Sequence, residues 1–397
     1  MPFSSLGLSP ELLRAVGARN YLTPTPVQKE AIPAILAGKD VWACAQTGSG
    51  KTAAFALPLL QTTRTVYRAT PLRVRALVLV PTRELAAQVG ESIQFFAGHL
   101  QQPMKVISVF GGVSINPQMM ALRGGADIVV ATPGRLLDLV DHNALRLGDT
   151  AALVLDEADR LLDLGFADEL ASVIERLPRR RQNLLFSATF PPAVRALAER
   201  LLHDPVRIDV PATVATQPDI LQRSIRVDPE RRTQVLRHLI NKHGWTRTLV
   251  FVATRYATEH VAAKLRRVGI AANAFSGDMS QGARTKALAD FKTARIKVLI
   301  ATDVAARGID IEQLPAVVNY DLPRSTTDYV HRIGRTGRAG ESGVAVSFVP
   351  AGQENHFRLI EKRQGQRVPR EIIPGFEPAG AASSGRGDRK AEAGPKT

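Results

Sequence analysis

Short apolar segments rich in Val, Leu and Ile alternate with longer helix-like stretches along most of this 397-residue chain. This alternation is typical of a parallel β-sheet wrapped by helices, because parallel strands need long crossover connections. Seven candidate strands lie in the first half: Val41–Ala45, Ala76–Pro81, Lys105–Phe110, Asp127–Thr132, Ala152–Asp156, Asn183–Ser187 and Val206–Val210. Six lie in the second half: Ser224–Val227, Arg247–Ala253, Ala271–Phe275, Lys297–Thr302, Ala316–Asp321 and Gly343–Val349. We therefore predict two α/β domains of related architecture in series.

The boundaries of these domains follow from where the apolar periodicity stops. Residues 211–218 read PATVATQP, without periodicity and with small or helix-breaking residues, which is typical of a linker. After Val368 the content of Pro, Gly, Ala and Ser rises. We predict an N-terminal domain over 1–208, a linker over 209–218, a C-terminal domain over 219–368 and a flexible tail over 369–397.

The net charge of +15 is concentrated in one part of the chain. Residues 1–219 carry 22 basic and 20 acidic residues, whereas residues 220–368 carry 25 basic and 13 acidic residues. Such an excess on a folded domain indicates a surface that meets a polyanion. A solvated surface in which Arg replaces Lys is the alternative, and composition alone favours neither.

Several classes of protein are excluded by the same sequence. No apolar run approaches the roughly 18 residues that cross a bilayer, and the first residues lack a basic segment followed by an apolar one, as a secretory signal requires. The single cysteine, Cys44, cannot form an internal disulfide, which suits a reducing compartment. We expect a cytoplasmic protein with no membrane contact.

The first candidate strand ends in a glycine-rich loop that is followed by a helix rich in Ala and Leu. The loop reads Gln46-Thr47-Gly48-Ser49-Gly50-Lys51-Thr52. A loop of this kind wraps phosphates with its backbone N–H groups, and the helix N-terminus adds its dipole. Lys51 would reach the β- and γ-phosphates, and the Thr52 hydroxyl would bind Mg²⁺. Ala45 stands where the strict pattern has Gly, and a glycine-rich surface turn is the alternative.

A second strand, Leu153-Val154-Leu155, delivers two carboxylates at its end. Beside a phosphate loop, Asp156 would hold Mg²⁺ through water, and Glu157 would orient and deprotonate an attacking water. Either carboxylate alone would also serve as a helix N-cap. The pair, together with the upstream loop, predicts a site for nucleotide hydrolysis.

With Asp156-Glu157-Ala158-Asp159 the chain resembles the DEAD-box RNA helicases, and within them the bacterial RhlE-type branch. The resemblance covers roughly residues 1–368. Its motifs stand in order: AQTGSGKT at 45–52, PTREL at 81–85, GG at 111–112, TPGR at 132–135, DEAD at 156–159, SAT at 187–189, ATDVAARGID at 301–310 and HRIGRTGR at 331–338. It implies two tandem RecA-like domains, with ATP and Mg²⁺ as cofactors.

The resemblance also assigns residues around the nucleotide. It implies that Gln28 hydrogen-bonds to the adenine edge while Tyr21 stacks on its face. It implies further that Arg335 and Arg338 stabilise the charge of the transferring phosphoryl group. Gly308 and Asp310 are expected to approach the ribose. Ser187 and Thr189 are expected to bond to the Asp156–Asp159 segment, so that Ser187, Thr189 and Asp159 couple hydrolysis to unwinding.

The same resemblance implies an RNA site that contacts the sugar-phosphate backbone, with little sequence preference. The expected contacts are Pro81, Thr82, Arg83, Gly111, Gly112, Thr132, Gly134, Arg135, Arg255, Gly277 and Thr302. The two departures from the family pattern are Asn20, where Gly is usual, and Ser276, where His is common.

Three functions stay open on the sequence. The first is an RNA helicase that unwinds short duplexes locally or remodels ribonucleoprotein, with RNA-stimulated ATP hydrolysis. The second is an ATP-gated RNA clamp in which hydrolysis only times release, and the third is a DNA-directed motor. We expect a monomer that acts on RNA, for which ribosomal precursors and the mRNA-decay machinery are both compatible partners.

Overall fold

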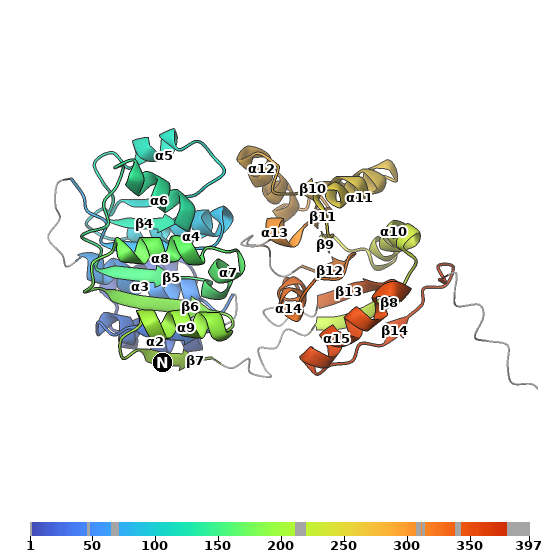
Figure 1. Cartoon of the computed structure of the whole chain (residues 1–397), viewed down its shortest axis with the longest axis horizontal. Coiled ribbons are helices and arrows are strands. Elements are labelled where there is room, and N and C mark those ends of the chain that lie inside the picture. Colours follow the sequence, from blue (N-terminus) through green and yellow to red (C-terminus); the bar gives the residue numbers. More distant parts are fainter. Residues whose placement is uncertain are drawn as a thin grey trace, which may run out of the picture. The chain divides into compact units, whose positions relative to one another are not determined.

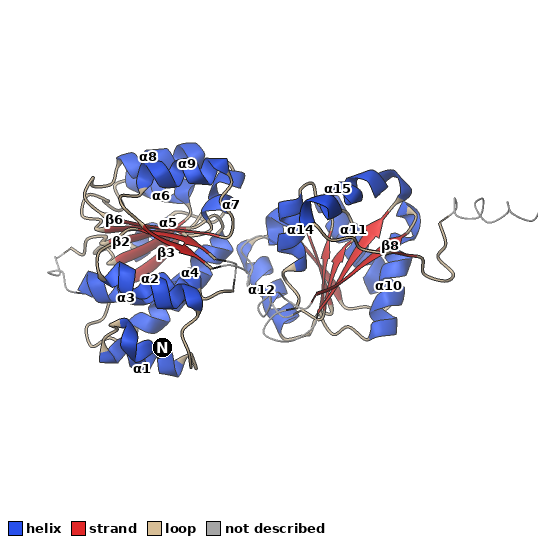
Figure 2. Ribbon diagram, turned by 90° about the horizontal axis from the view of Figure 1, so that it is seen from below, coloured by secondary structure: helices blue, strands red, loops and turns tan. Residues whose placement is uncertain are grey.

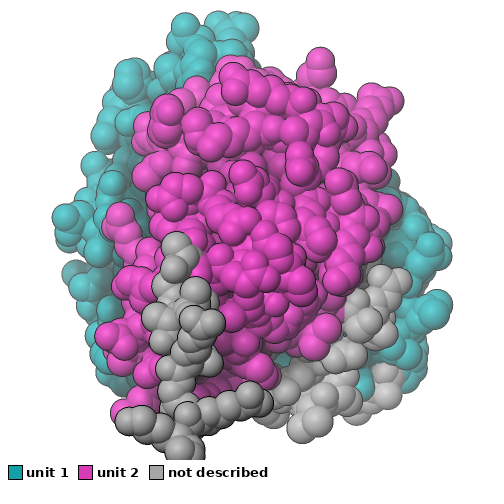
Figure 3. Space-filling view, turned by 90° about the vertical axis from the view of Figure 1, so that its right-hand side faces the viewer, with its two compact units in different colours: residues 1–213, 308–310 teal, residues 214–307, 311–397 magenta. Residues whose placement is uncertain are grey.

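The computed structural model describes residues 2–45, 48–64, 71–210, 220–306, 311, 314–337 and 343–378 (Figure 1). These residues form two compact units. Unit 1 holds the described residues up to Val210 and unit 2 those from Ile220 onward, and Figure 3 colours them separately. No helix in the described ranges has both the length and the apolar character of a membrane span.

Unit 1 is built on a seven-stranded sheet in the order β3-β4-β2-β5-β6-β1-β7, in which every pair of neighbours is parallel. Its strands β2, β4 and β5 are buried at every position, because helices cover both faces of a parallel sheet. The strands are β1 (Val41–Cys44), β2 (Ala76–Leu79), β3 (Val106–Val109), β4 (Ile128–Ala131), β5 (Ala152–Leu155), β6 (Gln182–Ser187) and β7 (Val206–Asp209).

Successive strand residues of unit 1 enter two separate hydrophobic cores. Val78 packs in the core with α1–α4, whereas Leu77 and Leu79 pack in the core with α6–α9, and Figure 2 shows the two helical layers on opposite faces of the sheet. The helices are η1 (Phe3–Leu6), α1 (Pro10–Ala18), α2 (Pro26–Leu36), α3 (Lys51–Arg64), α4 (Arg83–Ala97), α5 (Asn116–Ala121), α6 (Pro133–Asp141), α7 (Ala158–Asp163), α8 (Ala167–Glu175) and α9 (Pro192–Leu201).

Unit 2 repeats this plan. Its seven-stranded sheet has the order β10-β11-β9-β12-β13-β8-β14 and is also parallel throughout. When strands are numbered from the start of each unit, the two orders are identical. The strands are β8 (Ile220–Arg226), β9 (Thr248–Phe251), β10 (Ala272–Phe275), β11 (Val298–Ala301), β12 (Ala316–Asn319), β13 (Gly343–Val349) and β14 (Arg370–Glu371).

Helices also cover both faces of the second sheet. Helices α10 and α11 supply one core, and α14 and α15 supply another. The helices are η2 (Pro229–Arg231), α10 (Arg232–His243), α11 (Arg255–Arg267), α12 (Gln281–Lys292), α13 (Asp303–Ala306), α14 (Thr326–Ile333), η3 (Ala351–Gln353) and α15 (Glu354–Gln364). The prediction of two tandem α/β domains with parallel sheets is confirmed.

All thirteen predicted strands are present, but the predicted start of the tail is wrong. Residues 370–378 belong to unit 2, since β14 pairs with β8 and Ile373 is buried in the core with α10 and α11. Arg370 binds Glu361 on α15, with 2.8 Å between Nη1 and Oε1. Most of the predicted linker and residues 379–397 lie outside the described residues.

Candidate active site and strand-end clusters

The loop between β1 and α3 requires glycine at two positions. Gly48 and Gly50 have φ values of 80° and 89°, in the left-handed region that side chains disfavour. A Cβ on Gly50 would also lie 2.4 Å from Nε2 of Gln28. Gln46 and Thr47 lie outside the described residues. The described part of this loop therefore has the backbone that the phosphate-loop prediction requires.

Polar side chains in this loop are turned inward. Lys51 is buried at the start of α3, and its Nζ donates to the carbonyl oxygen of Ala45 at 2.9 Å. Thr52 follows it and is half-buried. The buried Oγ of Ser49 has no hydrogen-bond partner in the described part of the chain. A buried hydroxyl without a partner is unfavourable in the absence of a ligand, so the loop is built to accept one.

Asp156 and Glu157 follow β5, which is the fourth strand after β1 in the chain but is separated from β1 in the sheet only by β6. Asp156 is 3% exposed and accepts a hydrogen bond from the backbone N–H of Glu157 at 2.9 Å. Burial raises the pKa of Asp156 to about 6; the Lys51 ammonium opposes the rise and the Glu157 carboxylate adds to it. A bound cation would compensate for burying this carboxylate.

Glu157 adopts a left-handed backbone conformation, with φ 51° and ψ 52°. A glutamate in this region costs about 1–2 kcal/mol relative to the right-handed helix. Strain of this kind persists only where the surroundings enforce it, and it is concentrated at functional sites. Here it lies at the residue predicted to deprotonate water.

Ser187 and Thr189 are hydrogen-bonded to the segment that follows β5. Oγ of Ser187 accepts from the backbone N–H of Asp159 at 3.1 Å and donates to the carbonyl oxygen of Thr189 at 2.7 Å. The N–H and hydroxyl of Thr189 both donate to Oδ2 of Asp159, at 3.0 and 2.7 Å. The expected bonds are thus present, and they tie the loop after β6 to the carboxylate segment.

Gln28 lies against the phosphate loop. Its side chain is buried, Nε2 donates to the carbonyl oxygen of Gly50 at 3.1 Å, and Oε1 accepts from the Thr25 N–H at 3.0 Å. Each of these groups can form one further hydrogen bond. Tyr21 is 39% exposed, and its ring lies 6.4 Å from that of Phe96.

The predicted RNA residues of unit 1 gather at the carboxyl ends of β2, β3 and β4, which are neighbours in the sheet. Thr82 caps α4 by accepting from the Leu85 N–H at 3.2 Å. Gly112 has φ 78°, and a Cβ there would lie 2.9 Å from Nη1 of Arg83. Gly111 donates to Oγ1 of Thr132 at 3.4 Å. Pro81 follows β2, and Gly134 and Arg135 lie in the first turn of α6.

The predicted RNA residues of unit 2 gather in the same way, after β9, β10 and β11. Nη1 of Arg255 donates to Oδ1 of Asp278 at 2.6 Å, and both side chains are more than 60% exposed. Asp278 is the residue after Gly277. Thr302 caps α13 by accepting from the Ala305 N–H at 3.3 Å.

Comparison with known proteins agrees with this arrangement. The DEAD/DEAH box helicase model matches residues 25–197, and the helicase conserved C-terminal domain model matches residues 231–340. The chain is 40% identical to the DEAD-box ATP-dependent RNA helicase CshA of Bacillus cereus, over 95% of this chain and 71% of that protein. The chain belongs to the DEAD-box helicase family.

Two further relatives of this DEAD-box chain show the extent of the likeness. The ATP-dependent RNA helicase DeaD of Mycobacterium tuberculosis is 43% identical over 94% of this chain. The chain spans only 65% of that relative's length. A solved structure of S. cerevisiae Dbp5 bound to RNA and ADP BeF3 superposes with a TM-score of 0.81 and 33% identity, covering 94% of this chain and 95% of that one. The narrower RhlE-type assignment stays a prediction.

The remaining predicted site residues of the DEAD-box chain belong to its second half. Gly308, Asp310 and Arg338 lie outside the described residues. Arg335 follows α14 in unit 2 and is half-buried, and its carbonyl oxygen accepts from the Leu314 N–H at 3.2 Å.

Arg332 and Arg284 are buried arginines to which the sequence assigned no role. Arg332 is 3% exposed and binds Asp303 through two hydrogen bonds of 2.6 and 2.7 Å. Arg284 is 2% exposed and donates to the carbonyl oxygens of Ser276 and Ala305, at 2.9 and 3.2 Å. Arg284 therefore joins the loop after β10 to α13, which follows β11. Arg332 stands within HRIGRTGR, but its burial is not visible in the spacing of that motif.

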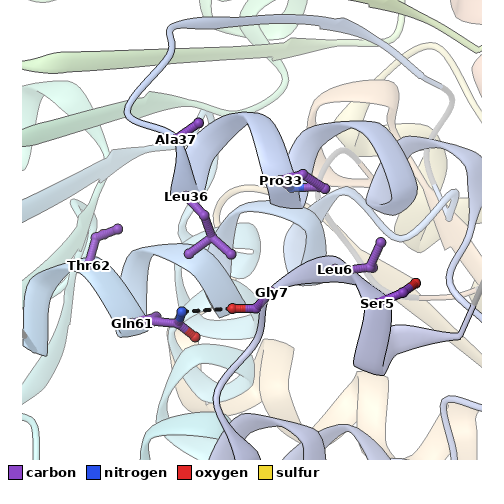
Figure 4. A pocket seen from close by; sticks show the side chains of 8 residues that line it. All are labelled: Ser5, Leu6, Gly7, Pro33, Leu36, Ala37, Gln61 and Thr62. Carbon is purple, nitrogen blue, oxygen red and sulfur yellow. Dashed lines mark hydrogen bonds between the residues drawn. The ribbon is translucent and has the colours of Figure 1, made fainter.

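A hollow of about 620 Å³ on unit 1 lies between η1 and the ends of α2 and α3 (Figure 4). Figure 4 shows Leu36 pointing toward the hydrogen bond of 2.9 Å from Nε2 of Gln61 to the Gly7 carbonyl oxygen. None of the described residues that line this hollow carries a charged side chain. It lacks the groups that would hold a phosphate and is not part of the candidate site.

Proposed function

We propose that this chain is an ATP-dependent RNA helicase that binds single-stranded RNA and unwinds short duplexes locally, with hydrolysis stimulated by RNA. One observation carries the proposal. In unit 1 the phosphate loop after β1, the carboxylates after β5 and the expected RNA residues after β2, β3 and β4 all follow strands of one parallel sheet, at its carboxyl edge. Ligands of open α/β sheets bind at that edge.

The residues of the loop fit ATP with Mg²⁺. The Ser49 hydroxyl, which has no hydrogen-bond partner among the described residues, and the left-handed glycines suit a phosphate chain, and Thr52 and Asp156 would hold the ion. In the described residues no cluster of three or more His, Cys, Asp or Glu could hold a metal ion. When bound, the ion would supply positive charge that neutralises the phosphate oxygens. The solved relative with bound ADP BeF3 and RNA supports both ligands.

Each side chain then has a defined task. Lys51 binds the β- and γ-phosphates, and Glu157 accepts a proton from the attacking water at its carboxylate. Gln28 uses the remaining capacity of its amide to read the adenine edge, with Tyr21 against the ring. Arg335 and Arg338 stabilise the charge that develops on the phosphoryl group, and Gly308 and Asp310 contact the ribose.

Dependence on RNA follows from where the groups reside. Arg335 belongs to unit 2 and the phosphate loop to unit 1. RNA held by residues of both units would raise the population in which Arg335 reaches the nucleotide. The RNA contacts are backbone N–H groups, glycines and arginines, which suit phosphates and sugars more than base edges, so that contacts to the 2′-OH would distinguish RNA from DNA. We expect the chain to act as a cytoplasmic monomer.

A strand-displacement assay tests this function. RNA and DNA duplexes of the same sequence are offered side by side, and ATP hydrolysis is measured with and without single-stranded RNA. We expect displacement of the RNA duplex alone and faster hydrolysis when RNA is present, with Lys51→Ala as the inactive control. RNA-stimulated hydrolysis without displacement would instead favour the RNA clamp. Equal hydrolysis with and without RNA would contradict the proposal.

A further inference from the structure

An exposed ridge runs along α11, beside the proposed RNA residues of unit 2. Tyr256, His260 and Lys264 are four residues apart and therefore lie on one side of the helix, and all three are exposed. Tyr256 is 77% exposed. Its ring is stacked on that of His260, with centroids 5.4 Å apart and an angle of 21° between the planes. The imidazole supports one face of the phenol ring and so limits its rotation.

Tyr256 of this ring pair lines a hollow of about 490 Å³ together with Arg255, one of the expected RNA residues. The hollow is formed by α11 and by the residues after β10, including Arg255, Tyr256, Ser276 and Asp278. Gly277 stands between the last two in the chain. Tyr256 and Arg255 are adjacent in the first turn of α11. A strand of RNA that leaves the loops after β9 and β10 would therefore pass the ring pair.

The charge around the rings fits a polyanion. Helix α11 has one acidic residue, Glu259, and four basic residues: Arg255, Lys264, Arg266 and Arg267. Glu259 is paired with Arg266, and Asp278 with Arg255. An exposed ion pair contributes little stability, so an RNA phosphate can replace Asp278 on Arg255 at small cost.

We propose that the Tyr256–His260 ring pair is a stacking platform for a base of single-stranded RNA flanking the nucleotides held at the strand ends of unit 2. The proposal rests on the RNA-binding function above and adds a contact to a base to an otherwise backbone-directed site. Aromatic rings beside a basic groove hold single strands without reading sequence, because every base has a face that stacks. The platform lengthens the RNA segment that is bound and raises the affinity for long RNA.

Three RNA ligands separate stacking from phosphate binding. The first is the shortest unstructured oligonucleotide that fully stimulates ATP hydrolysis. The second adds unstructured nucleotides at both ends, and the third adds the same sugar-phosphate units without bases. The binding of each is measured for the parent full-length chain, for Tyr256→Ala and for Tyr256→Phe. Leu359→Ala is the matched control, since Leu359 is an exposed apolar residue on α15, at 59%.

The parent and Tyr256→Phe should prefer the extended oligonucleotide to its base-free counterpart by about tenfold, as one stacked base provides. Tyr256→Ala should lose that preference and bind the shortest oligonucleotide like the parent, and Leu359→Ala should match the parent throughout. If Tyr256→Ala kept the preference for the extended oligonucleotide over its base-free counterpart, the platform would be ruled out. The exposed ring would then be assigned to contact with a protein partner. An equal loss for all three ligands would also overturn the platform. If the parent binds no RNA of any length, the proposed function itself fails, and the platform with it.

Discussion

The two units share one sheet topology and differ in the loops at its carboxyl edge. The loop after β1 is the phosphate loop, whereas the equivalent strand β8 is followed only by Val227 and Asp228 before η2 begins. The carboxylates after β5 correspond to Tyr320 and Asp321 after β12. In unit 2 these positions are tied together, because Arg232 of α10 donates to both the Asp321 carboxylate and the Tyr320 carbonyl. The sheet alone does not make a nucleotide site; the loops on it do.

The residues that follow the equivalent strands β2 and β9 are similar in the two units. Thr82 and Thr254 both cap the helix that follows, at 3.2 and 3.1 Å, and each precedes an arginine. After that arginine the units diverge again. Glu84 binds Arg83 at 2.9 Å, whereas unit 2 has the exposed Tyr256. Three of these residues, Thr82, Arg83 and Arg255, are among those expected to hold RNA. The proposed RNA contacts therefore use equivalent positions of both units, whereas the phosphate loop and the carboxylates of the proposed nucleotide site occur only in unit 1 among the described residues.

Glu157→Gln should have the largest effect of the changes that test this difference between the two sheet edges. The amide keeps the shape and the left-handed backbone but cannot accept a proton, so we expect RNA-stimulated hydrolysis to fall by roughly 10²–10⁴-fold while ATP and RNA binding persist. Steady-state hydrolysis and RNA binding in the presence of ATP measure both.

Asp321→Asn is the matched control, since it changes the corresponding loop of unit 2. Asp321 accepts hydrogen bonds from the Ala253 N–H at 2.8 Å and from Arg232. Replacing its carboxylate by an amide should therefore lower the free energy of unfolding of unit 2. The rate of ATP hydrolysis should stay near that of the parent. If Asp321→Asn slowed hydrolysis as much as Glu157→Gln, the difference between the two edges would not be catalytic.

The second test concerns β14, the counterpart of β7. Ending the chain after Val368 removes the buried Ile373 and leaves the Glu361 carboxylate, 9% exposed, without Arg370. We expect the free energy of unfolding of unit 2 to fall by roughly 3 kcal/mol, mostly from the lost apolar burial. Urea denaturation measures the change. A chain that ends at Pro378 should unfold like the full chain, and equal stability of both truncated chains would show that β14 is dispensable.

This strand also shows what the sequence can and cannot reveal. Strands such as Leu153–Leu155 were predictable because both faces of a parallel sheet are buried, so the strand is continuously apolar. Strand β14 is Arg370-Glu371, two charged residues held by side-chain pairs and an edge position, with no apolar signal. The motifs located the loops of the site. The left-handed backbone of Glu157 and the burial of Arg332 depend on tertiary contacts that no local pattern encodes.

A third test compares the glycines after the equivalent strands β3 and β10. At Gly112 a Cβ would approach Arg83, and φ is 78°, so Gly112→Ala should destabilise unit 1 by about 1–2 kcal/mol. Around Gly277 nothing in the described part of the chain lies within 4 Å of such a Cβ, and Gly277→Ala should unfold like the parent. Urea denaturation of both variants decides the matter. Equal losses would mean that the two loops are equally constrained, contrary to the described geometry.

The smallest expected effect lies in the segment before β1, which has no counterpart among the described residues of unit 2. Asn20 follows α1 with φ 57°, and this explains why Gly is usual at that position in the family: both residues enter the left-handed region readily. Asn20→Gly should therefore change the free energy of unfolding by less than about 0.5 kcal/mol, whereas Asn20→Ala should lower it by roughly 1 kcal/mol. Since Tyr21 follows directly, the Ala variant should also bind ATP more weakly than the Gly variant. Thermal unfolding and ATP titration of the two variants measure these differences. Equal destabilisation by Gly and Ala would show that the amide of Asn20, and not its backbone conformation, holds the residue beside the proposed adenine site.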